Sequence, residues 1–147
     1  MPTVKQFSDV LSEWTGVLMR HSTRDINRFM KEYGFSMPQF HTMMRLYYRE
    51  TCGVSDIADD VGFTKAASSQ MIDRLVQQGL LTRTENPDDR RERQIALTEK
   101  GKKLIEEIVS ARHRWMENLT TTLSSEEQQA IVDALILLTQ AAKRLEQ

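Results

Sequence analysis

The stretch that decides the fold is VSDIADDVGFTKAASSQMIDRLV, residues 54–76. A sharp turn between two helices needs a small residue inside the first helix, here Ala58, and a residue free to adopt positive φ at the turn, here Gly62. Thr64 can then cap the second helix, which Gly79 ends. The stretch therefore predicts a helix-turn-helix. The apolar side chains expected to hold its two helices together are Ile57, Val61, Phe63 and Met71.

The second helix of this motif carries a polar face that suits a DNA groove. An α-helix fits the major groove of B-DNA, and short polar side chains near its N-terminus can reach base edges. Gln70 can pair with adenine, Lys65 can meet a guanine edge or a phosphate, and Arg74 suits the phosphate backbone. The residues of this helix expected to contact DNA are Lys65, Ala66, Ser68, Ser69, Gln70 and Arg74, with Asp73 on the same face.

After the second helix the apolar period changes from that of a helix to that of a strand. Residues 80–84 and 94–97 alternate and predict two short β-strands. The segment between them, NPDDRRER, begins with turn residues and is densely charged, so it predicts an exposed hairpin tip. Guanidinium groups on such a tip suit the negative potential of a narrow minor groove. The tip residues expected to contact DNA are Arg90, Arg91 and Arg93.

Two acidic residues in the same tip need an explanation, because carboxylates repel phosphates. Asp88 and Asp89 immediately precede the first two arginines of the tip. A carboxylate two residues from an arginine can hold the guanidinium fork in one orientation. We therefore expect these aspartates to orient the arginine side chains.

Apolar residues at helical spacing cover the remainder of the chain. A first helical stripe begins near Phe7 and ends at Gly34. Two pairs have the spacing of a capping box, Ser36 with Gln39 and Ser124 with Glu127. The two outer helical regions carry broad apolar stripes that a small domain cannot cover alone, which favours self-association. The residues expected to cap helices are Ser36, Ser55, Thr64, Thr98 and Ser124.

Composition limits the class of protein. With 147 residues, 39% of them hydrophobic and 28% charged, the chain suits one globular domain and is not typical of a disordered protein. The net charge of −1 means that a nucleic-acid partner would be bound by a local basic patch. No apolar run approaches the ~20 residues that span a bilayer, and the N-terminus has no signal-peptide core, so we expect no membrane partner.

The same composition argues against an enzyme. The chain has no phosphate-binding glycine loop, no metal-spaced histidine and cysteine set and no nucleophile elbow, so we expect no catalytic residues, cofactor or metal. A single cysteine, Cys52, excludes an internal disulfide and favours a reducing cytoplasm. We expect a buried thiol there. A redox-sensing thiolate would need nearby positive charge, for which Arg49 is the nearest candidate in sequence.

The order of these motifs resembles that of the MarR family of bacterial and archaeal regulators. The helix-turn-helix is followed by DRLVQQGLLTR at 73–83, DDRR at 88–91 and LTEKG at 97–101. The most specific part of the resemblance is the D-x-R wing motif, formed by Asp89 and Arg91, followed by the L-T-x-x-G motif. The resemblance covers nearly the whole chain.

The resemblance implies a mainly α (α+β) fold, a winged helix-turn-helix with a small β-hairpin wing. It implies one domain over residues 1–147, with a DNA-binding lobe at about 36–98 and long dimerisation helices at 1–35 and 99–147. The two ends of the chain would interdigitate in a homodimer.

The same resemblance implies the mode of DNA binding. The Thr64–Gln78 helix would enter the major groove of double-stranded DNA, and a wing arginine would enter the minor groove. Two-fold symmetry then predicts a pseudo-palindromic operator with half-sites ~34 Å apart, bound by a regulator that we expect to be a repressor. A winged-helix module that binds another protein remains the alternative, and it would need neither the polar helix face nor the arginine tip.

The family resemblance also implies an effector site between the dimerisation helices and the DNA-binding lobe. Small aromatic or anionic molecules would bind there, and Arg112 could meet a carboxylate. The alternative is that the aromatic residues and Met44 only fill the core. The residues expected to line the site are Trp14, His21, His41, Met44, Tyr47, Arg112 and Trp115.

Overall fold

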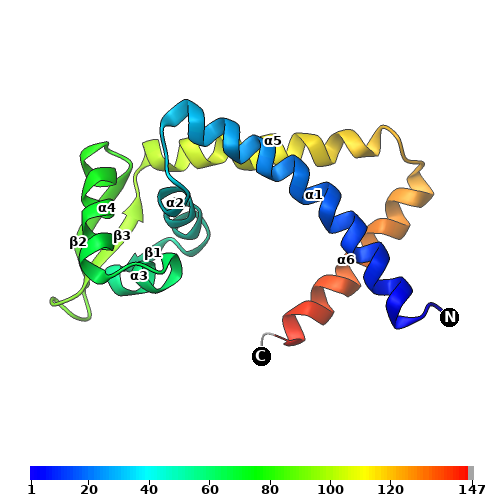
Figure 1. Cartoon of the computed structure of the whole chain (residues 1–147), viewed down its shortest axis with the longest axis horizontal. Coiled ribbons are helices and arrows are strands. Elements are labelled where there is room, and N and C mark those ends of the chain that lie inside the picture. The colour runs from blue at the N-terminus through cyan, green and yellow to red at the C-terminus, as the bar shows by residue number, and fades with distance from the viewer. Residues whose placement is uncertain (146–147) are drawn as a thin grey trace. The chain divides into compact units, whose positions relative to one another are not determined.

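A computed structural model describes residues 1–145 of the chain. It divides into two compact units, Met1–Ser110 and Ala111–Gln147, so that the fifth helix runs from the first unit into the second. Figure 1 shows the short helices and the strands gathered together in the first unit. The elements are α1 (Val4–Tyr33), α2 (Met37–Arg49), β1 (Thr51–Gly53), α3 (Val54–Val61), α4 (Lys65–Gln77), β2 (Leu81–Glu85), β3 (Arg93–Leu97), α5 (Glu99–Thr120) and α6 (Ser125–Leu145).

The sheet has three antiparallel strands in the order β1-β3-β2. The predicted hairpin is confirmed to within a residue at either end, with Leu81 opposite Leu97 and Glu85 opposite Arg93. The sequence did not predict β1, which is too short to show an alternating pattern. It forms because β3 has a free edge, along which Cys52 pairs with Ile95.

One apolar core joins α2, α3, α4, the sheet and the N-terminal half of α5. Ile57, Ile72, Ile95 and Ile105 come from four different elements, and each is completely buried. On α2 the buried side chains include Leu46, which is 2% exposed. Since α4, β2 and β3 contribute to the same core, α4 and the hairpin are held on one rigid body.

Four of the five predicted capping residues cap their helices. Ser36 and Gln39 form the expected capping box, and Ser124 does so with Glu127. Ser55 does not cap α3, so that prediction was wrong. The helix begins directly after β1, which places Ser55 in its first turn. The Gly53 N–H donates instead to Asp56 Oδ2 at 3.2 Å.

The L-T-x-x-G motif forms a joint between the end of α4 and the start of α5. The Thr98 hydroxyl donates to the Gly79 carbonyl at 2.6 Å and accepts the Gly101 N–H at 3.0 Å. The Thr98 N–H donates to the Leu80 carbonyl at 3.0 Å. A Cβ added at Gly101 would overlap that carbonyl oxygen and lie 3.1 Å from Leu97 Cδ2. Glycine is therefore required at this joint because α5 starts against the backbone of Leu80.

A second joint links α1 to α5 inside the first unit. The Tyr33 hydroxyl donates to Glu107 Oε2 at 2.8 Å, and this hydrogen bond to a carboxylate raises the pKa of Tyr33. Phe29 stacks on Phe35 with ring centroids 5.7 Å apart and meets the edge of Phe40 at 6.2 Å. Gly34 ends α1 in the left-handed conformation at φ 71°, as predicted.

Both end helices leave large apolar side chains exposed in the isolated chain. On α1, Phe7 and Val10 are 54% and 63% exposed. No residue of α6 over its described length, Ser125–Leu145, is buried. The exposed apolar residues of α6 are Ile131, Val132, Leu135, Ile136, Leu137 and Leu145. Within residues 1–145, none of the helices combines the length and the apolar character needed to cross a membrane.

Candidate nucleic-acid interface

The helix-turn-helix has the geometry that its sequence predicts. Gly62 ends α3 at φ 68°, in the left-handed region that glycine adopts without strain. The Thr64 Oγ1 accepts the Ala67 N–H at 3.1 Å and so caps α4. Ala58 is buried at 4% exposure where the two helices meet. The turn therefore fixes α4 against α3 through local backbone rules.

Not all four residues expected to hold these helices together do so. Ile57 and Met71 are buried, and Val61 is half-buried. Phe63 is exposed, so its predicted core position was wrong. It follows the left-handed glycine and lies outside both helices, so its direction is set by the turn and not by a helical stripe.

The two faces of α4 are clearly separated. Its inner face is packed in the core and consists of Ser68, Met71, Ile72 and Leu75. Ser68 was expected to contact DNA, and that prediction was wrong because its side chain is completely buried. Its spacing of three, four and seven residues from the apolar members of this face places it on the core side. The exposed residues of the outer face are Lys65, Ala66, Gln70, Asp73 and Arg74, with Ser69 half-buried at its edge.

An arginine that the sequence analysis did not single out contacts this face. Arg83 lies on β2 opposite Ile95. Its Nη2 donates to Ser69 Oγ at 3.0 Å, and its Nη1 lies 2.9 Å from Asp73 Oδ1. The alternation with Leu81 predicts that this position faces inward, where an arginine needs a partner. That is the signal that could have identified it.

The segment between β2 and β3 forms a compact turn with exposed arginines. Asn86 N–H donates to the Glu92 carbonyl and Glu92 N–H to the Asp89 carbonyl, each at 3.0 Å. Arg90 and Arg91 are exposed in this turn. Arg93 is exposed too, on the first position of β3, and its Nη1 lies 3.6 Å from Glu85 Oε1 on the opposite strand.

The two aspartates of the turn shape its backbone. Asp89 Oδ1 accepts the backbone N–H of Arg91 at 2.9 Å, and the Asp88 N–H donates to Asn86 Oδ1 at 3.0 Å. Along the described chain, no ion pair joins either aspartate to a wing arginine. The prediction that they hold the guanidinium forks was therefore wrong. A side chain two residues away reaches the nearby backbone N–H more readily, as in an Asx turn.

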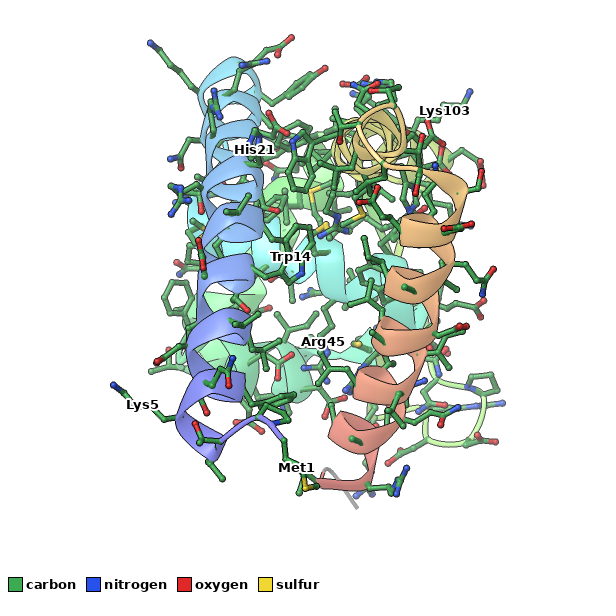
Figure 2. All side chains as sticks on the ribbon, turned by 90° about the vertical axis from the view of Figure 1, so that its right-hand side faces the viewer. Met1, Lys5, Trp14, His21, Arg45 and Lys103 are labelled. Carbon is green, nitrogen blue, oxygen red and sulfur yellow. The ribbon has the colours of Figure 1, made fainter. Side chains whose placement is uncertain are left out.

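Two of the expected effector residues line one hollow of the first unit. A hollow of about 280 Å³ lies between α2 and α3, and it includes His41 and Met44. Tyr47, Trp14 and His21 do not line it. Figure 2 shows Trp14 and His21 on α1 and Arg45 on α2. Arg112 and Trp115 belong to the second unit. The residues lining the hollow are His41, Thr42, Met44, Arg45, Ile57, Asp60 and Val61.

Cys52 is buried, as expected, and an arginine contacts its sulfur. Arg45 Nε donates to Cys52 Sγ at 3.1 Å, and the same guanidinium forms an ion pair with Asp60. Arg45 therefore ties α2 to β1 and α3. Arg49, the nearest arginine in sequence, is exposed and does not make this contact.

Known regulators resemble this chain over most of its length. Residues 35–92 match the family model described as the MarR family. The chain is 33% identical over 125 residues to the uncharacterized HTH-type transcriptional regulator YfiV of Bacillus subtilis, covering 85% of this chain and 78% of that protein. It is 31% identical to the HTH-type transcriptional repressor MdtR of the same organism, covering 78% and 74% of the two chains.

The fold has a close match among solved structures. The crystal structure of the transcriptional regulator Tm0710 from Thermotoga maritima aligns with a TM-score of 0.79 at 25% identity, over 95% of this chain and 96% of that one. The motif order, the winged helix-turn-helix and the relatives agree. The chain belongs to the MarR family of winged-helix DNA-binding transcription regulators, which are not enzymes.

Proposed function

We propose that this protein is a sequence-specific regulator that binds double-stranded DNA as a homodimer and represses transcription from a pseudo-palindromic operator. The observation that carries this proposal is the position of two basic, exposed elements on one rigid lobe: the outer face of α4 and the β2–β3 turn. The repressor role is supported by the relative MdtR, whose name describes a transcriptional repressor.

The outer face of α4 is assigned to the major groove. Lys65 lies in its first turn, beside the capping residue Thr64, where side chains approach base edges first. Gln70 is exposed further along the same face and can make two hydrogen bonds to adenine. Arg74 follows one turn later and suits a phosphate. Ala66 offers an apolar contact to a thymine methyl group.

The β2–β3 turn is assigned to the minor groove. Its backbone hydrogen bonds give the tip a fixed shape, so that Arg90 and Arg91 are exposed on an ordered loop. A guanidinium group in a narrow minor groove is stabilised by the concentrated negative potential there. Arg93 lies at the base of the turn, and its exposed side chain suits a contact with the neighbouring phosphate backbone.

A second copy of the chain would cover the apolar side chains of the end helices. Phe7 and Val10 on α1 and the apolar residues of α6 would otherwise stay in water. Burial of apolar surface stabilises association by roughly 25 cal/mol per Å² before the costs of ordering are subtracted. A symmetric homodimer is the simplest assembly that buries the same faces of both copies.

We also propose that a small aromatic or anionic effector releases the protein from DNA. The hollow between α2 and α3 supports such a site because it combines apolar walls, Met44 and Val61, with the polar side chains of His41 and Arg45. It adjoins the helix-turn-helix directly, so a ligand there could alter the position of α3. Five of the expected effector residues do not line this hollow and remain candidates for further contacts with the effector. They are Trp14, His21, Tyr47, Arg112 and Trp115.

Salt dependence tests the proposed function. If Lys65, Arg74 and the wing arginines of two copies meet phosphates, the protein releases several counterions on binding DNA. The logarithm of the affinity should then fall with the logarithm of the salt concentration with a slope of about −5 or steeper. Fluorescence anisotropy of a labelled duplex between low and physiological salt measures the slope. A flat response, or no binding to any duplex, would favour the protein-binding alternative.

A further inference from the structure

We propose that Arg83 is a positioning residue for DNA recognition, which orients the Ser69 hydroxyl and neutralises Asp73 on the outer face of α4. This inference rests on the proposed DNA-binding function and extends it to a residue outside the groove-contacting set. It assigns the wing strand β2 a part in setting which bases α4 recognises.

The geometry is that of one guanidinium bridging two residues of the recognition helix. Ser69 and Asp73 are four residues apart, so their side chains lie one turn apart on the same face of α4. Arg83 Nη2 lies 3.0 Å from Ser69 Oγ, and Arg83 Nη1 lies 2.9 Å from Asp73 Oδ1. A planar guanidinium can make both contacts at once, which the single ammonium of a lysine does less well.

The guanidinium is committed to the protein. The Arg83 side chain is only 26% exposed, and its Nε is buried without a hydrogen-bond partner among the described residues. Arg83 lies opposite Ile95 on the inner side of the hairpin, and this strand pairing fixes the position of its Cα. Arg83 is therefore held differently from Arg90 and Arg91, which are exposed in the turn and free to reach DNA.

The first consequence concerns charge. The Asp73 side chain is 53% exposed on the face assigned to the major groove. An unpaired carboxylate there would repel the phosphates that Lys65 and Arg74 attract. The Arg83 guanidinium offsets this charge within the protein, so α4 can approach the duplex.

The second consequence concerns base recognition. A serine hydroxyl has one proton and two lone pairs, and Arg83 Nη2 already occupies one lone pair of Ser69. The Ser69 proton must then point away from the guanidinium. Because the Ser69 oxygen accepts a hydrogen bond from a cation, its O–H becomes a better donor. Ser69 would therefore seek an acceptor on DNA, such as N7 or O6 of guanine, N7 of adenine or O4 of thymine.

A double-mutant cycle tests this coupling. The variants are R83Q, S69A and the double variant, with affinity measured by fluorescence anisotropy on a duplex that the wild-type protein binds. We expect S69A to weaken binding about tenfold and R83Q to weaken it more, because R83Q also leaves the charge of Asp73 unpaired. The double variant should match R83Q, because the Ser69 contact is already lost without Arg83. Adding D73N to R83Q should recover part of the loss. Q77A, on an exposed position of α4 outside the contact set, should change affinity by less than about twofold.

The outcomes separate the inference from the function on which it rests. If the losses of R83Q and S69A multiply in the double variant, or if R83Q lowers the magnitude of the salt slope by about two, one for each copy in the dimer, Arg83 touches DNA itself and the inference is overturned. If the wild-type protein binds no duplex, the proposed function is overturned as well. If the thermal melt of R83Q shows poor folding, R83K takes its place in the cycle, since it keeps the charge beside Asp73 but loses the two-point contact.

Discussion

Arg91→Ala is expected to weaken DNA binding about a hundredfold while the fold stays intact. A charge-assisted contact contributes about 1.5 kcal/mol, and a dimer loses two of them, so the total of roughly 3 kcal/mol corresponds to about two orders of magnitude in affinity. The side chain is exposed in the β2–β3 turn. The hydrogen bond that shapes the turn uses the Arg91 backbone N–H, which alanine retains.

The measurement is an anisotropy titration at fixed salt, accompanied by a circular dichroism melt. Arg114→Ala is the matched control, because it removes an exposed arginine from α5, outside the helix-turn-helix and the wing. We expect the control to bind DNA as the wild-type protein does. Equal affinities for the Arg91 and Arg114 variants would refute the assignment of the wing to DNA.

Gly101→Ala is expected to destabilise the fold by about 2–3 kcal/mol, although alanine is the better helix former. Its Cβ would overlap the carbonyl oxygen of Leu80 and press on Leu97 Cδ2. That carbonyl also accepts the Thr98 N–H, so the backbone cannot move aside without losing a hydrogen bond that holds the start of α5. The cost of this overlap exceeds the ~1 kcal/mol that a helical Gly-to-Ala change usually contributes.

Denaturant unfolding of both variants and the wild type measures the difference. Gly16→Ala is the matched control, since Gly16 is also helical and its added Cβ would meet only the flexible end of Arg20 at 3.4 Å. We expect the control to be neutral or to gain up to about 1 kcal/mol in the free energy of unfolding. If Gly101→Ala were as stable as Gly16→Ala, the close approach of α5 to the Leu80 backbone would not constrain the fold.

The parts of the fold that obey local rules could be predicted from the sequence. Gly62 in the left-handed conformation, the Thr64 cap and the Ser36 capping box depend on residues within four positions of one another. The hairpin was also predictable, because its period-two pattern and turn residues lie in one short segment. The family motifs then placed these elements in order.

The features that depend on distant segments could not be predicted in the same way. Strand β1 forms because it pairs with the edge of β3, which lies some 40 residues later in the chain. The sequence of three residues alone cannot predict this pairing. The start of α3 follows from β1, which is why Ser55 does not cap it. Likewise Phe63 points outward because of the turn geometry.

The candidate site shows the same division. The exposed residues of α4 and the wing arginines were identified from the sequence by their position and charge. Ser68 was expected to contact DNA, although its spacing from Met71 and Leu75 places it on the core side of the helix. Arg83 was missed because its partners lie on another element.

The effector site stays a prediction, because aromatic and basic residues alone do not specify a cavity. Only His41 and Met44 of the seven line the hollow between α2 and α3. Their helix also supplies Arg45, whose ion pair with Asp60 and contact with Cys52 connect three elements. Which residues gather around a cavity depends on how α2 packs on α3, and the two helices are separate in sequence.

Selection of bound duplexes from a random DNA pool is the measurement that bears most directly on the account. If two copies of this chain each insert α4 into a major groove, the enriched sequences will contain an inverted repeat whose half-sites are centred about 10 base pairs apart, or a multiple of that distance. Enrichment of a single unrepeated element, or of no sequence above the starting pool, would mean that the paired recognition helices do not act on DNA in this way.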